Sequence, residues 1–131
     1  MNPAAPIPNP DLPVPPEWLS ARGAEIFSGL VGIISDMGIA SASDTAALAM
    51  LASRLEEVEI CTAIIEDAGR TYTTNSESGV LHRPRPEVTQ RSEAMRHAQS
   101  LLAEFGLTPA ARAKVSVAKQ PEQNPFKALL G

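Results

Sequence analysis

Four arginines between residues 83 and 96 are the side chains best suited to binding a polyanion. The cluster consists of Arg83, Arg85, Arg91 and Arg96, with His82 and His97 at its two ends. A guanidinium group is permanently charged and donates forked hydrogen bonds to phosphate oxygens. Arg83 and Arg85 each precede a proline, which restricts the backbone of both arginines to extended conformations. The pattern predicts a phosphate-binding patch.

An ordinary structural role is the alternative for these arginines. Glu87 stands four residues before Arg91, and Glu93 stands three residues before Arg96 and four before His97. Residues at such spacings face each other on a helix, where an ion pair contributes about 0.2–0.5 kcal/mol. The sequence leaves both interpretations open.

A second basic group follows toward the C-terminal end. It consists of Arg112, Lys114 and Lys119. We assign Arg112 and Lys114 to the predicted binding patch. The alternative is that these cations cap a helix, because positive charge is favourable at a helix C-terminus.

The charge of the chain is divided unevenly. Residues 1–68 contain two basic and ten acidic side chains, a net charge of −8, whereas residues 69–131 contain nine and five, a net charge of +4. Such a split favours a polyanion facing the C-terminal half. The alternative is that the charged residues only form solvated helix faces, which would give the same net charges.

Residues that could catalyse a reaction or bind a metal are scarce. His82 and His97 have no Cys, Asp or second His at the spacing of a metal site. Cys61 is the single cysteine and lies within an apolar helical pattern, which favours a buried structural thiol and excludes an internal disulfide framework. No glycine-rich phosphate loop or nucleophile elbow occurs. We therefore expect no enzyme activity, no cofactor and no metal.

Helical periodicity predicts the elements that hold these side chains. Ser20 is suited to cap a first helix, and Ser41 with Asp44 resembles a capping box that opens a second, long helix. A third helix begins at Pro86, and its predicted contact stripe consists of Val88, Met95, Ala98, Leu102 and Phe105. Helix stops are predicted at Gly38, Gly69 and Gly106.

Residues between the second and third helices have the composition of a β-hairpin. Residues 70–74 and 80–82 are rich in strand formers, and residues 75–79 are rich in turn formers. We predict a mainly α fold with one short β-hairpin, at about residues 70–83, between two long helices.

The long helix at residues 44–68 carries more apolar surface than one partner helix can cover. We expect one face to pack within the subunit and another against a neighbouring subunit, and the candidates are Leu48, Leu51, Leu55, Val58, Ile60 and Ile64. A head-to-tail interface closes into a ring when its rotation permits, so the prediction is a ring-forming subunit. Gly23, Gly29 and Gly32 in the first helix would let another helix approach closely.

The two ends differ in composition from a helical core at residues 17–115. Residues 1–16 contain seven prolines and are predicted to be a flexible arm. Residues 116–131 are predicted to be a linker and a docking tail, in which Phe126, Leu129 and Leu130 contact a partner. The sequence has neither the pattern of a secretory signal nor an apolar run of membrane-spanning length, so we expect a cytosolic protein without membrane contact.

One run of residues resembles a known family. Residues 105–112 read FGLTPAAR, which is similar to the GLTP-x-x-R signature of the small terminase subunits of tailed bacteriophages, in the cos-type helical family. Upstream, the residues around Thr73, His82 and Pro84 resemble the threonine-rich hairpin and the His-Pro element of that family, and a long helix follows. The resemblance covers roughly residues 18–115, with Arg83 as an inserted residue between His82 and Pro84.

The resemblance implies a role in packaging viral DNA. Such subunits recognise a packaging site on double-stranded DNA and recruit the large terminase subunit, which carries the ATPase and the nuclease. The expected partners are therefore viral DNA, the large terminase subunit and further copies of this chain in the host cytoplasm. Two other functions fit the residues: a helix-turn-helix regulator with its turn at residues 106–109, and a helical adaptor that binds no nucleic acid.

Overall fold

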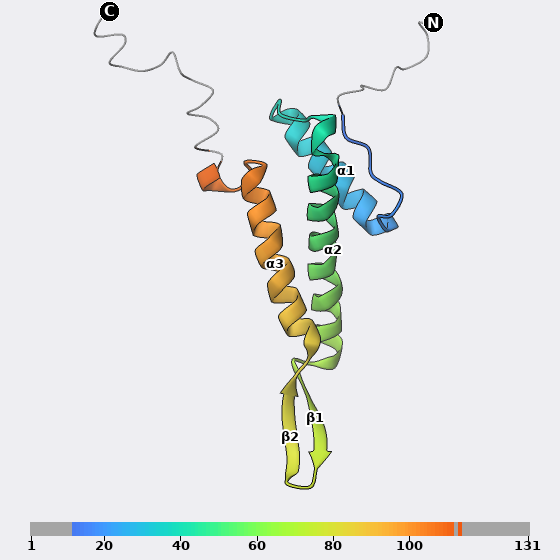
Figure 1. The fold of residues 1–131 in the computed structure, drawn as a ribbon, viewed down its shortest axis with the longest axis vertical. Coiled ribbons are helices and arrows are strands. Elements are labelled where there is room, and N and C mark those ends of the chain that lie inside the picture. Colours follow the sequence, from blue (N-terminus) through green and yellow to red (C-terminus); the bar gives the residue numbers. More distant parts are fainter. Residues whose placement is uncertain (1–11, 112, 114–131) are drawn as a thin grey trace, which may run out of the picture.

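The computed structural model describes residues 12–111 and 113, whose elements are helices and one β-hairpin (Figure 1). In chain order they are α1 (Ala21–Asp36), a 3-10 turn (Ala42–Asp44), α2 (Thr45–Ala68), β1 (Thr71–Ser76), β2 (Gly79–Pro84) and α3 (Pro86–Glu104). The predicted mainly α fold, with one hairpin between the two longest helices, is confirmed. Of the predicted arm at residues 1–16, residues 12–16 are described, and Pro13 there is buried.

Helices α2 and α3 lie side by side, and α1 crosses α2 near the end that is far from the hairpin (Figure 1). The core forms where the helices meet, around Phe27, Ile34, Leu48 and Leu51, each 0 % exposed. These side chains come from α1 and α2, and buried Ala98 adds α3 to the same cluster. The core therefore sits at one end of the molecule, away from the hairpin.

The contact face of α3 differs from the predicted stripe. Met95 is 48 % exposed, whereas its neighbour Ala94 is 0 % exposed and Ala98 is 3 % exposed. Ala94 and Ala98 are four residues apart and lie on one face of the helix. Short side chains at these two positions leave room for the α2 side chains opposite. The prediction that Met95 belongs to the buried stripe is wrong.

The predicted helix stops are confirmed at Gly38, Gly69 and Gly106, which all have positive φ angles. Gly106 ends α3 with a φ of 71°, a conformation that side-chain-bearing residues rarely adopt. The Leu107 amide then donates to the Leu102 carbonyl at 2.8 Å, which turns the chain back over the helix end.

The helix starts are only partly as predicted. The Ser20 hydroxyl accepts a hydrogen bond from the Gly23 amide at 2.9 Å and caps α1, as predicted. Ser41 instead accepts from the Ser43 amide at 3.3 Å and caps the 3-10 turn, while the Asp44 side chain makes no capping hydrogen bond. The predicted capping box is wrong because a 3-10 turn precedes α2.

The hairpin is longer and its turn is tighter than predicted. Pairing runs from Thr71 opposite Pro84 to Ser76 opposite Gly79 and leaves a two-residue turn. The Ser76 hydroxyl donates to the Gly79 carbonyl at 3.1 Å and accepts from the Ser78 amide at 3.3 Å. These bonds close the turn within two residues, so the turn is shorter than the predicted 75–79.

Polar contacts tie the start of α1 to the middle of α2. The Arg22 guanidinium donates two hydrogen bonds to the Glu59 carboxylate, at 2.7 and 2.9 Å, and a third to Glu25 at 3.0 Å. The Ser20 hydroxyl donates to the Glu56 carboxylate. The forked bond links α1 to α2 through both oxygens of Glu59.

The Arg22–Glu59 pair predicts a loss of stability in acid. Hydrogen bonding to Arg22 lowers the pKa of Glu59 below its ordinary value of 4.5, so the pair stabilises the fold above pH 4.5. This contribution is lost as the pH falls through the lowered pKa. Between about pH 7 and about pH 3, urea unfolding should show a larger fall in stability for the wild type than for Glu59→Gln, which cannot titrate at this position. Equal falls in the two proteins would contradict the prediction.

Candidate nucleic-acid and assembly surfaces

The hairpin is a basic projection that follows the acidic helix α2. Residues 70–85 contain three arginines and one glutamate, a net charge of +2, whereas the preceding helix α2 contains one arginine and five acids, a net charge of −4. The strands extend beyond the ends of α2 and α3 (Figure 1). Every residue of β2 is exposed, so the hairpin presents its positive charge without cover from the described chain.

One face of the hairpin combines an aromatic ring, an arginine and an apolar side chain. Tyr72 pairs with Arg83, and Thr74 pairs with Leu81, and directly paired residues lie on the same face of a two-stranded sheet. Tyr72 is 36 % exposed and Leu81 is 40 % exposed. The other face carries His82. A surface of this kind can place a guanidinium on a phosphate while the ring and the leucine cover apolar groups beside it.

The predicted arginines do not form one patch. Arg83 is exposed on the hairpin, and Arg85 is half-buried at the start of α3, where its Nε has no hydrogen-bond partner within the described residues. Arg91 is half-buried, whereas Arg96 is exposed. The last two are five positions apart in the helix, which places them about 140° apart around α3. Arg112 and Lys114 lie outside the residues whose side chains are described.

The alternative ion pairs on α3 do not form. Arg91 donates to the Thr62 hydroxyl of α2 at 3.4 Å and makes no ion pair with Glu87. Within the described chain the salt bridges are those of Arg22 with Glu25 and Glu59. The ion-pair interpretation of Arg91 and Arg96 is therefore wrong, and Arg96 is left as an exposed cation.

Arg70 is a basic residue that the sequence analysis did not select. The Arg85 amide donates to the Arg70 carbonyl at 2.9 Å, which extends the pairing of the strands by one step and brings the two residues together. Only the strand register reveals this proximity, because the two residues are fifteen positions apart in the sequence. Arg70, Arg83 and Arg85 thus gather near the base of the hairpin.

The predicted assembly residues of α2 divide into three groups by their exposure. Leu48 and Leu51 are 0 % exposed in the core of their own chain, so they have no surface to offer a neighbour. Leu55 and Val58 are half-buried; the remaining two residues of the set, Ile60 and Ile64, are 46 % and 37 % exposed. The division arises because α2 is packed by α1 as well as by α3, so a single chain covers much of its apolar surface.

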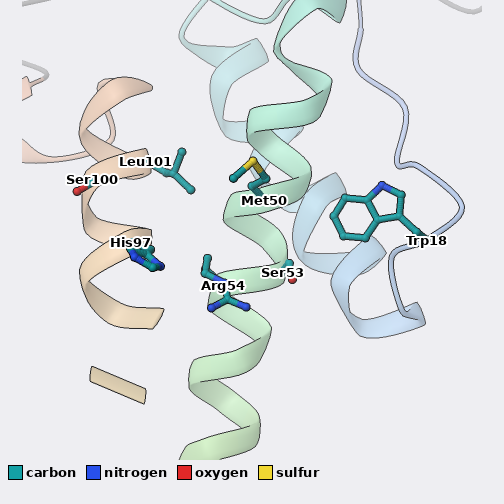
Figure 2. Close-up of a pocket in the computed structure, with 7 residues that line it drawn as sticks. All are labelled: Trp18, Met50, Ser53, Arg54, His97, Ser100 and Leu101. Carbon is teal, nitrogen blue, oxygen red and sulfur yellow. The ribbon is translucent and has the colours of Figure 1, made fainter. Parts of the chain in front are cut away.

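A hollow of about 540 Å³ opens between α2, α3 and the segment before α1. Figure 2 shows Trp18 on one side, Met50 and Arg54 on α2, and His97 and Leu101 on α3. Trp18 is 63 % exposed and Met50 is 57 % exposed. We call this feature the α2–α3 hollow. Of its residues, the sequence analysis named His97 alone, at the end of the arginine cluster, since the hollow is formed by three separate segments.

Cys61 is buried, as predicted, at the side of α2. Burial raises the pKa of its thiol, and the nearby Glu57 carboxylate, to which the thiol donates at 3.6 Å, raises it further. The thiol is therefore held in its protonated form, which is a poor nucleophile. Among the described residues, no group of three or more histidine, cysteine, aspartate and glutamate side chains could hold a metal ion. None of the described helices has the length and apolarity that a bilayer span requires.

Comparison with known proteins identifies the family of the chain. The sequence model of the family described as "Phage terminase, small subunit" matches residues 23–122, a stretch that contains α2, the hairpin and α3 and most of α1. No curated protein and no solved structure matches the chain. Because the match spans about three quarters of the sequence, the chain belongs to the small terminase subunit family of phages.

Proposed function

We propose that this chain recognises the packaging site on viral double-stranded DNA and recruits the large terminase subunit to it. The observation that carries the proposal is the family match over residues 23–122. In this role the chain works in the host cytoplasm as a non-catalytic subunit without a cofactor, and the ATPase and nuclease belong to the large subunit. The match favours this function over a helix-turn-helix regulator or an adaptor without a nucleic-acid role.

We propose further that the subunits assemble into a ring. Large apolar side chains remain exposed on all three helices: Ile33 on α1 is 51 % exposed, Met50, Ile60 and Ile64 on α2 are 57 %, 46 % and 37 % exposed, and Met95 on α3 is 48 % exposed. Burying such a side chain fully contributes about 1.5–3 kcal/mol. A neighbour that covers them by a head-to-tail contact leads to a closed ring when the rotation permits.

The assembly is tested by native mass spectrometry. At micromolar concentration we expect the wild type to give a single mass that is a multiple of the chain mass. Ile64→Asp should lower that mass, because an unpaired carboxylate would enter an apolar contact. Ile64→Val keeps the apolar character and serves as the matched control. A wild-type protein that is monomeric throughout would rule out the ring.

The proposed DNA contact is electrostatic and is made by the hairpin and the start of α3. Arg83 is exposed on the hairpin and Arg85 lies next to it at the start of α3. Each phosphate that a protein neutralises releases counterions, so binding weakens as salt rises. A ring repeats the same basic projection in every subunit, and this multiplicity strengthens weak individual contacts. Arg91, Arg96, Arg112 and Lys114 complete the proposed DNA-binding set.

Neutralising the hairpin arginines tests the DNA contact. Arg83→Gln with Arg85→Gln should weaken binding and flatten the slope of log affinity against log salt by about one unit per lost phosphate contact. Glu77→Gln removes an acid from the same hairpin and should shift binding in the opposite direction. Fluorescence anisotropy with a labelled duplex at several salt concentrations measures both effects. Unchanged affinity and slope would place the DNA contact elsewhere, with the region around Arg22 as the next candidate.

The C-terminal tail is proposed to recruit the large terminase subunit. Phe126, Leu129 and Leu130 lie outside the described residues and beyond residue 122, where the family match ends. The three side chains follow a polar spacer and would share one face of a single helical turn. Burying each against a partner contributes about 1.5–3 kcal/mol before the loss of chain freedom is counted.

Deleting residues 121–131 separates recruitment from the other activities. The truncated protein should keep its native mass and its affinity for DNA, because the helices and the hairpin are intact. It should no longer stimulate the ATPase of the large subunit, measured as phosphate release. Normal stimulation by the truncated protein would refute the docking role, and loss of the assembly would show that the tail belongs to the ring instead.

A further inference from the structure

The α2–α3 hollow is an apolar site that its own described chain leaves open. Trp18 and Met50 are both more than half exposed at its rim, and Leu101 lies on its α3 side (Figure 2). A tryptophan side chain gains more from burial than most other residues, and a volume of about 540 Å³ accommodates several side chains. The walls therefore favour an apolar occupant.

The same hollow contains a cation without an acceptor. Arg54 is half-buried on α2 and makes no hydrogen bond or ion pair with any described residue. A guanidinium has five N–H donors, and a half-buried one is stabilised by a carboxylate. His97 lies across from Arg54 on α3 (Figure 2) and adds a second nitrogen-bearing side chain. The occupant should accordingly carry a carboxylate next to its apolar group.

The outer face of α1 combines an apolar group with a neighbouring carboxylate. It is formed by Gly29, Gly32, Ile33 and Asp36. Ile33 is 51 % exposed, and Asp36 is exposed and makes no ion pair within the described chain. No atom of another described segment lies within 4 Å of the position a Cβ would take at Gly29 or Gly32. Residues three, four and seven positions apart share one side of a helix, so the glycines, the isoleucine and the aspartate lie together.

We propose that the outer face of α1 of one copy docks into the α2–α3 hollow of the next copy. Ile33 enters between Trp18 and Met50, and the Asp36 carboxylate pairs with the Arg54 guanidinium. The spacing of the two α1 side chains is similar to that of their proposed partners on α2. Ile33 and Asp36 are about 4.5 Å apart along α1, and Met50 and Arg54 are about 6 Å apart along α2. The glycines allow α1 to approach closely because they carry no side chain.

This contact specifies how the proposed ring is built, and it rests on that proposal. The two surfaces are different parts of the same chain. Each copy therefore binds one neighbour through the outer face of α1 and the other neighbour through its α2–α3 hollow. Such a contact is head-to-tail and propagates around a ring rather than closing a two-fold dimer. The hairpin and its arginines take no part in it and remain free for DNA.

Charge reversal at the two residues tests the contact. Arg54→Glu and Asp36→Arg should each weaken association at least about tenfold, because each places like charges together. The double variant should recover most of the loss, since the pair is restored in reverse order. Sedimentation velocity over a concentration series measures association. Arg70→Glu reverses an exposed charge at the base of the hairpin, away from both surfaces, and should leave association unchanged.

The outcomes distinguish this contact from the ring itself. Rings that persist in both single variants would refute the Asp36–Arg54 contact and leave the ring proposal standing. A double variant no better than the singles would also refute the contact. Monomers in every protein, the wild type included, would refute both proposals.

Gly32→Leu provides an independent test that does not depend on charge. Leucine favours helix more than glycine, so thermal unfolding of α1 should occur at a higher temperature. The larger side chain should nevertheless weaken association, because it holds α1 away from the hollow. A more stable monomer with weaker association supports the contact, and unchanged association overturns it.

Discussion

The packing of α2 between α1 and α3 is the constraint on which the other surfaces depend. Leu48 and Leu51 are fully buried by this packing, and the short side chains Ala94 and Ala98 let α3 lie close to α2. The part of α2 left uncovered includes exposed apolar residues, and Arg54, which forms no salt bridge with any described residue. The same packing directs the hairpin away from the core, because β1 follows α2 and β2 precedes α3. The basic projection and the proposed subunit contact are thus consequences of one helix arrangement.

The acidic and basic side chains of the chain lie in different parts of the fold. The acids in the middle of α2 are used within the subunit, where Glu59 binds Arg22 and Glu56 accepts from Ser20. Among the described residues, Arg54 and the hairpin arginines form no salt bridge with an acid. A negative net charge is therefore compatible with DNA binding, because neighbouring helices neutralise part of the acidic surface while the hairpin keeps its positive charge.

The sequence by itself determined the order of the elements, their approximate ends and the family. Ser20, Pro86 and Gly106 start or end helices through the backbone of residues close to them in the sequence. Their effects therefore do not depend on the rest of the fold. The hairpin between the long helices follows from composition for the same reason. One local prediction was nevertheless wrong: Ser41 caps a 3-10 turn and does not form the predicted capping box.

Only the tertiary structure decided which side of each helix is covered. Helical periodicity shows that apolar residues recur, but it does not say which neighbour meets them, so Met95 was expected inside and Ile60 was not distinguished from Leu48. The same holds for polar partners: Arg91 binds Thr62 on another helix although Glu87 stands at favourable spacing. The α2–α3 hollow was invisible in the sequence because its walls come from segments far apart in the chain. Burial and pairing between such segments are set by packing in three dimensions, which local patterns do not encode.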